Sequence, residues 1–228
     1  FAVLKDKNLL TYYESIWIKK YDKIDLTIAY TLFSNGLYDK AFAKFIEAYE
    51  NGLVGDQLKS IVLAAYILHG YDYPSVYNIH GFPDEDRRFL KLIFSNKPVK
   101  IPEEFNSIYL DILKQIINVA DDDSLNKYLA YAHYFQKPVW KDIIDIMIDN
   151  RMFASALGLC DFLYNTKKQG VDMQVEESEL VFYMGVCYFK MEKYFEAIDM
   201  FHLAKDKGYK DNDLKEFMLW TDMYLQNM

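Results

Sequence analysis

The chain has 228 residues, of which 52% are hydrophobic and 17% aromatic, enough apolar side chains to build a substantial core. Its formal net charge of -8 at pH 7 disfavours a broad basic surface for nucleic acid or for an anionic membrane. No apolar run reaches the roughly 18 to 20 residues that a membrane span needs, and residues 1–30 lack the pattern of a signal peptide. We therefore expect a soluble protein that binds neither nucleic acid nor membrane through this segment.

Apolar residues at helical spacing begin close to the N-terminus. Residues 3–20 predict a leading helix, and residues 22–55 predict a pair of helices joined by a turn at Asn35-Gly36. Residues 56–68 predict a further helix, and residues 69–102 predict an insertion that interrupts the pairing of helices. The insertion contains four of the five prolines, Pro74, Pro83, Pro98 and Pro102. The first pair carries a regular set of apolar and small residues, namely Ile28, Ala29, Leu32, Tyr38, Ala41, Phe45 and Ala48.

The middle of the chain predicts two more pairs. Residues 103–119 and 122–136 predict two helices, with the run from Asp121 to Ser124 supplying the turn and the N-cap of the second. Residues 137–170 predict the next pair. It repeats the spacing of the first pair through Trp140, Ile143, Met147, Phe153, Ala156, Cys160 and Leu163.

Residues 178–211 carry the most regular pair. One stripe on its first helix consists of Val181, Met184, Gly185 and Tyr188, and one on its second consists of Ala197, Phe201 and Ala204. Glycine within a helix costs about 1 kcal/mol relative to alanine. We therefore expect Gly185 to face Ala197 and Ala204 in a closely packed pair. Residues 212–228 predict a capping helix, whose Leu214 and Trp220 cover this pair.

The pairs at 22–55, 137–170 and 178–211 resemble tetratricopeptide repeats, units of about 34 residues with large, Gly and aromatic positions on a first helix and Ala, Phe and Ala on a second. The resemblance implies an all-α fold, a right-handed α-solenoid of stacked antiparallel helix pairs with roughly eleven helices in a single domain spanning residues 1–228. Residues 56–102 are then a degenerate repeat with the Pro-rich insertion, and residues 103–136 are a second degenerate repeat.

In tetratricopeptide proteins, a fixed set of positions on the first helix of each repeat lines the concave face, where protein or peptide partners bind. In the first repeat the resemblance places there Lys23, Leu26, Thr27, Tyr30, Phe33 and Ser34. In the repeat at 137–170 it places there Pro138, Lys141, Asp142, Asp145, Ile148 and Asp149. In the last repeat it places there Glu179, Phe182, Tyr183, Val186, Phe189 and Lys190.

Two features of this face indicate how a partner would bind. The aromatic residues of the first and last repeats predict apolar anchors for a partner. The alternative is that they pack on neighbouring helices, on the insertion or on a missing domain. Asp142, Asp145 and Asp149 form an acidic stripe, which is either a solvated helix face or a patch that selects a Lys- or Arg-bearing ligand. Because the chain lacks the Lys and Asn residues with which some family members grip acidic tails, acidic C-terminal peptides are not expected.

The sequence carries no catalytic or metal-binding motif. The four histidines show no metal-ligand spacing, and there is no Gly-rich phosphate loop or nucleophile elbow, so we expect no cofactor and no metal. For the aromatic-rich stretch between His69 and His80, which includes Tyr71, Asp72, Tyr73 and Tyr77, we favour ordered packing over a reactive site. Helix capping and the helix dipole explain the acids at 121–123, with a cation site as the alternative.

Two cysteines, Cys160 and Cys187, lie in apolar helical runs. Two thiols are too few for a disulfide framework, so we expect both to be buried and reduced. Reduced thiols fit a cytoplasmic location.

These observations predict a non-catalytic scaffold that binds a protein or peptide carrying hydrophobic and basic residues. The chain starts at Phe1 and not at Met, and its usage of Ile, Lys, Tyr and Asn is typical of an AT-rich genome, so we expect a module of a larger bacterial protein. Two alternatives are the peptide-sensing half of a transcription regulator and a repeat domain appended to a glycosyltransferase. An enzyme centred on the insertion is a further alternative, and homo-oligomerisation is left open.

Overall fold

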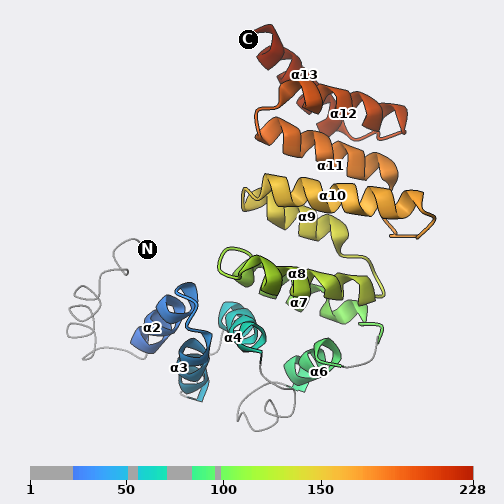
Figure 1. Ribbon diagram of the computed structural model, residues 1–228. Coiled ribbons are helices and arrows are strands. Elements are labelled where there is room, and N and C mark those ends of the chain that lie inside the picture. Colours follow the sequence, from blue (N-terminus) through green and yellow to red (C-terminus); the bar gives the residue numbers. More distant parts are fainter. Residues whose placement is uncertain (1–22, 51–55, 71–83, 96–98, 228) are drawn as a thin grey trace. The chain divides into compact units, whose positions relative to one another are not determined.

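The computed structural model describes residues 23–50, 56–70, 84–95 and 99–227 of the chain (Figure 1). Within these ranges the chain forms eleven α-helices and two short 3-10 helices, together with an isolated β-bridge between Ile101 and Phe135. The expected all-α class is confirmed for this part of the chain. The leading helix predicted at residues 3–20 lies outside the described residues.

The chain divides into two compact units, Phe1–Gln136 and Lys137–Met228, where the sequence predicts a single domain. The boundary falls between the expected repeats 103–136 and 137–170. The helices of the first unit are α2 (Lys23–Ser34), α3 (Tyr38–Glu50), α4 (Asp56–His69), α6 (Asp84–Ile93), η2 (Glu103–Phe105), α7 (Asn106–Ile116), α8 (Asp122–Ala130) and η3 (Tyr131–Tyr134). Those of the second unit are α9 (Trp140–Asp149), α10 (Phe153–Lys168), α11 (Glu177–Lys190), α12 (Tyr194–Asp206) and α13 (Asn212–Gln226).

In the first unit, α2 and α3 pack against each other as the periodicity predicts. The small residues of the expected grid, Ala29, Ala41 and Ala48, are fully buried, and the ring of Phe45 is buried among them. Because alanine adds little bulk, the two helices approach closely around the ring of Phe45. The helix α4 then packs against both α3 and α7.

Helix α6 lies within the predicted insertion and was not expected from the sequence. Its apolar residues Phe89, Leu90 and Ile93 are buried, whereas its first turn is acidic. One of these acids, Asp86, is buried as well, and its Oδ1 lies 2.9 Å from Nζ of Lys59 on α4. This ion pair compensates the charge that the fold takes out of water. The stretch 71–83, with the expected aromatic loop and His80, lies outside the described residues.

Two stacked tyrosines join α7 and α8. The rings of Tyr109 and Tyr128 lie 4.7 Å apart and nearly parallel, and both are buried. Each hydroxyl donates to the backbone carbonyl of the other residue, at 3.2 Å from Tyr109 and 2.9 Å from Tyr128. The predicted N-cap of α8 is confirmed, since the side chain of Asp121 accepts from the backbone N–H of Ser124 at 2.9 Å.

The same three-residue turn joins the helices of three pairs, at residues 35–37, 150–152 and 191–193. The middle residue of each turn has a positive φ, 75° at Gly36, 60° at Arg151 and 62° at Glu192. Its N–H donates to the carbonyl three residues back, and the following N–H donates to the carbonyl five residues back. These are the two hydrogen bonds of the Schellman motif. The local geometry of a helix pair therefore recurs at three places, although only the first turn contains glycine.

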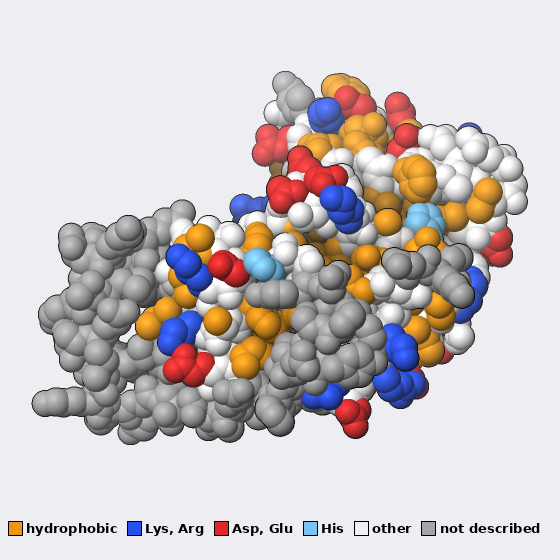
Figure 2. Space-filling model, turned by 60° about the horizontal axis from the view of Figure 1, so that its bottom comes forward, with side chains coloured by type: hydrophobic (Ala, Val, Ile, Leu, Met, Phe, Trp, Pro, Cys, Tyr) orange, Lys and Arg blue, Asp and Glu red, His pale blue; other side chains and the backbone are white. Residues whose placement is uncertain are grey.

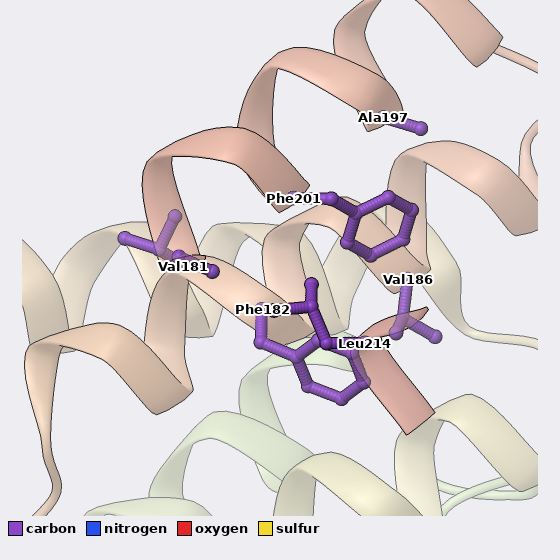
Figure 3. Packing of buried hydrophobic residues seen from close by; sticks show 7 residues of the cluster. Val181, Phe182, Val186, Ala197, Phe201 and Leu214 are labelled. Atoms are coloured by element: carbon purple, nitrogen blue, oxygen red, sulfur yellow. The ribbon is translucent and has the colours of Figure 1, made fainter. Parts of the chain in front are cut away.

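The core of the second unit is centred on Phe201 (Figure 3). Around it lie buried side chains of α11, α12 and α13, namely Val181, Phe182, Val186, Ala197, Ala204 and Leu214. A Cβ added to Gly185 would lie 2.5 Å from Cε1 of Phe201. The predicted close approach at Gly185 is confirmed, but the atoms that it meets belong to the Phe201 ring and not to the two alanines.

The helix predicted at residues 212–228 is present as α13, with Leu214 buried against this core. The expectation that Trp220 also covers the pair is wrong, because its side chain is 43% exposed. Phe217 takes the inward position, with its ring centroid 5.6 Å from that of Phe201.

Candidate functional site

Of the predicted site residues of the first repeat, Phe33 lies inside the α2–α3 pair. Phe33 is only 2% exposed and makes edge contacts with Tyr38 and Phe45, with ring centroids 5.5 and 6.5 Å away. Tyr30 is half-buried against Phe45 at 5.5 Å, and Leu26 is half-buried. Lys23 lies outside the side chains that the structure describes. Packing on the neighbouring helix accounts for Phe33, which leaves it little surface for a partner.

In the last repeat the aromatic residues divide between core and surface. Phe182 is buried, and its ring stacks on Tyr209 with centroids 4.4 Å apart. Phe189 is half-buried and Lys190 is exposed. Phe189 contacts α13 through Phe217 at 5.5 Å and Tyr224 at 5.8 Å. Of the predicted apolar anchors in this repeat, Phe189 is therefore the one that keeps an exposed part.

The predicted acidic stripe lies on the surface of α9. Asp142 and Asp149 are exposed and Asp145 is half-buried. The hydroxyl of Tyr183 on α11 donates a hydrogen bond to the carboxylate of Asp145. One turn of helix away, Nζ of Lys141 lies 3.0 Å from Oε1 of Glu179, again joining α9 to α11. The structure thus brings the stripe of one pair together with Tyr183 and Glu179 of the next.

Electrostatic interactions couple this group of side chains. Burial raises the pKa of the Asp145 carboxyl, and the neighbouring charges of Asp142 and Asp149 raise it further, while Tyr183 and Lys141 act in the opposite direction. The hydrogen bond that Lys141 donates to Glu179 raises the pKa of Lys141, and the attraction of Lys141 to the charges of Glu179 and Asp145 acts in the same direction. Acidic side chains thus predominate on the surface formed by α9 and α11, and Lys141 lies among them.

Burial and the same acidic surroundings together raise the pKa values of two tyrosines. Burial raises the pKa of Tyr183, and the charges of Asp145 and Glu179 add to the effect. Burial, followed by the charges of Asp211 and Glu179, raises the pKa of Tyr209 to about 12. Both phenols therefore stay protonated at neutral pH and remain hydrogen-bond donors. Sequence reasoning placed neither Tyr209 nor Asp211 in the site, because both lie in the link to α13 and outside the first-helix positions.

A cavity of about 530 Å³ lies between α11 and α13. Its walls are Phe189, Trp220, Met223, Tyr224 and Asn227. The ring of Tyr224 stacks on Tyr194 with centroids 4.8 Å apart, which holds one wall in place. Of these residues, the sequence analysis placed only Phe189 on a binding surface. The missed signal was the second apolar stripe of α13 at Trp220, Met223 and Tyr224, since Leu214 and Phe217 already supply an inward face.

The reactive groups of the described residues offer little chemistry. Cys160 and Cys187 are unpaired and buried, as predicted. Burial raises the pKa of both thiols, that of Cys187 to about 12, so neither forms the reactive thiolate near neutral pH. Burial also lowers the pKa of His133. Among the described side chains there is no group of three or more His, Cys, Asp or Glu that could hold a metal ion.

Basic side chains do not dominate the view in Figure 2, where lysine and arginine are scattered among acidic and hydrophobic residues. Of the helices within the described ranges, none combines the length and apolar character needed to cross a membrane. Comparisons of the chain with protein-family models, with curated proteins and with solved structures gave no match.

Proposed function

We propose that this chain is a non-catalytic, tetratricopeptide-like scaffold that binds a Lys- or Arg-bearing peptide segment on the surface formed by α9 and α11. The observation that supports this proposal most is the hydrogen bond from Tyr183 to Asp145, beside the ion pair of Lys141 and Glu179. These contacts join the side chains of the first helices of two successive pairs. An acidic surface therefore continues from one pair to the next.

The repeated turn supports the comparison with tetratricopeptide repeats. The pairs α2–α3, α9–α10 and α11–α12 share the same three-residue linker with the same two hydrogen bonds. Each second helix then begins with an aromatic residue, Tyr38, Phe153 or Tyr194. A chain that repeats one helix-turn-helix geometry can stack its pairs, and stacked first helices give an extended binding surface.

The charges at this surface favour a cationic ligand. Asp142 and Asp149 are exposed, and within the described part of the chain neither has an ion-pair partner. Asp145 is half-buried, where a lower effective dielectric strengthens its attraction to a cation. Lys141 is 56% exposed and is held by Glu179. An ammonium or guanidinium group of a ligand can therefore take a place among these carboxylates as Lys141 does.

Two further features fit a binding role in the cytoplasm. The buried, unpaired thiols Cys160 and Cys187 are compatible with a reducing compartment. Their raised pKa values and burial give them no role as nucleophiles, which favours a scaffold over an enzyme.

The proposal is tested with short peptides of equal length in which alanine alternates with lysine, arginine or glutamate. We expect the lysine and arginine peptides to bind the whole chain, with an affinity that falls as salt is added, and the glutamate peptide not to bind. Isothermal titration calorimetry measures the three affinities. Equal binding of the lysine and glutamate peptides would contradict the proposal.

A further inference from the structure

The cavity between α11 and α13 is lined by Phe189, which also packs against the core of the second unit, and by exposed side chains at the end of α13. On α13, Leu214, Phe217 and Thr221 face inward, and Thr221 donates its hydroxyl proton to the carbonyl of Phe217 at 2.6 Å. Beside and behind this inward face, the helix exposes further large apolar residues. They are Leu219 at 60%, Trp220 at 43%, Met223 at 54% and Tyr224 at 51%. Apolar residues gathered in this way commonly mark a surface that binds a partner.

Trp220, Met223 and Tyr224 meet the half-buried Phe189 of α11 around the cavity. Its volume of about 530 Å³ exceeds that of one large side chain and lies within the range of pockets that bind ligands. The amide nitrogen of Asn227 donates to the carbonyl of Met223 at 2.6 Å, which directs the amide oxygen away from that bond. This oxygen can accept a hydrogen bond from a backbone N–H of a ligand.

The cavity and the acidic surface share helix α11. Phe189 follows Tyr183 by six residues, a rise of about 9 Å along the axis, and α9 and α13 contact α11 through these two residues. A few residues of an extended peptide span that distance. The charges of the acidic surface select which peptide binds, since a basic chain complements Asp145 and Glu179.

We propose that the cavity receives one bulky apolar side chain, such as leucine or tryptophan, of the basic peptide whose charged groups lie on the acidic surface. The inference rests on the proposed function and names the ligand more closely. Phe189 then acts as a wall of the pocket and not as an anchor that enters the partner. The ligand is a basic peptide with a bulky apolar residue a few positions from a lysine or arginine.

The experiment compares the lysine-alanine peptide with a version in which one alanine is replaced by leucine. We expect the leucine peptide to bind wild-type protein about tenfold more tightly, because burial of the larger side chain favours the complex. In Met223→Arg a charged chain enters the cavity, and we expect the advantage of leucine to vanish. The matched control is Leu219→Arg, which alters an equally exposed residue of α13 outside the cavity. It should keep the tenfold advantage.

Thermal unfolding monitored by circular dichroism establishes that both variants are folded. If the leucine advantage persists in Met223→Arg, or is absent in wild-type protein, the cavity is not the subsite. A preference for lysine over glutamate that survives in the alanine peptides would then leave the proposed function standing, whereas loss of that preference would remove both. If sedimentation shows wild-type dimers that Met223→Arg separates, a second copy of the chain fills the cavity and the proposal is overturned.

Discussion

The ring of Phe201 occupies the space that a side chain at Gly185 would need, since an added Cβ would lie 2.5 Å from Cε1 and 2.6 Å from Cδ1 of that ring. Phe201 lies within the core cluster of the second unit (Figure 3), and Gly185 faces its ring from α11. The ring is fully buried and cannot swing into solvent. The missing side chain at position 185 is therefore what allows the two helices to pack around Phe201.

Gly185→Ala should lower the free energy of unfolding, although alanine is the better helix former by about 1 kcal/mol. Displacing the buried ring should outweigh that gain, with a net loss of about 1 to 3 kcal/mol, and Gly185→Leu should lose more. Urea unfolding measures both. Gly158→Ala on α10 is the control, because a Cβ there meets no atom within 4 Å, and it should stabilise the protein by up to about 1 kcal/mol. Equal stabilisation by both alanine variants would refute the packing argument.

Glu192→Gly should stabilise the turn between α11 and α12. Glu192 has a φ of 62°, a conformation that costs a residue with a Cβ about 1 kcal/mol and costs glycine almost nothing. We expect a gain of up to about 1 kcal/mol, reduced by the greater freedom of glycine in the unfolded chain. Glu196→Gly, at an exposed position within α12, should instead destabilise by a similar amount. Chemical denaturation of the two variants checks the opposite signs.

The raised pKa of Asp145 predicts that the stability of the protein depends on pH. Because the folded state raises the pKa of this carboxyl, it binds more protons than the unfolded chain in the range just above the ordinary value. The contribution of Asp145 to stability therefore falls as the pH rises through that range, and the carboxylate opposes folding above it. Asp145→Asn should thus gain stability relative to wild type as the pH increases from roughly 4 to 7.

Urea unfolding at several pH values follows this difference. Asp142→Asn is the control, because it removes an exposed charge from the same stripe. It shows how much of the change in stability comes from weaker repulsion among the aspartates and how much from the half-buried carboxylate of Asp145. If the difference in the free energy of unfolding between Asp145→Asn and wild type does not change with pH, burial does not raise the pKa of Asp145 as described.

The thiols of Cys160 and Cys187 should react slowly with a disulfide reagent in the native protein and rapidly after denaturation. Both are buried, and the raised pKa leaves little thiolate at neutral pH. Absorbance of the released thiolate follows the reaction over time. Rapid labelling of the native chain would show that the helices around them open readily.

Periodicity predicted most helices of the described chain, because each buried stripe repeats at helical spacing. The turn at Asn35-Gly36 and the N-cap at Asp121 were also predictable, since glycine and aspartate are typical of those positions. The equivalent turns at Arg151 and Glu192 carry no such signal, as ordinary residues adopt a positive φ there. Helix α6 was missed because the prolines of the insertion outweighed its short apolar stripe.

The candidate site was predictable only in part. The acidic stripe on α9 follows from the spacing of its aspartates, but the contact of Asp145 with Tyr183 depends on how successive pairs pack. The cavity could not be foreseen either. Helix α13 is apolar on two sides, and the sequence does not indicate which of Phe217 and Trp220 turns inward.

The most direct test of the account is the affinity of Asp145→Lys for the lysine-alanine and glutamate-alanine peptides, measured by calorimetry beside wild type. We expect the variant to bind the lysine peptide at least about tenfold more weakly and to favour the glutamate peptide. Asp199→Lys, an exposed residue of α12, makes the same change in net charge away from the surface and should bind as wild type does. If Asp145→Lys keeps the wild-type affinity for the lysine peptide, or if both variants weaken equally, the surface of α9 and α11 is not the binding site.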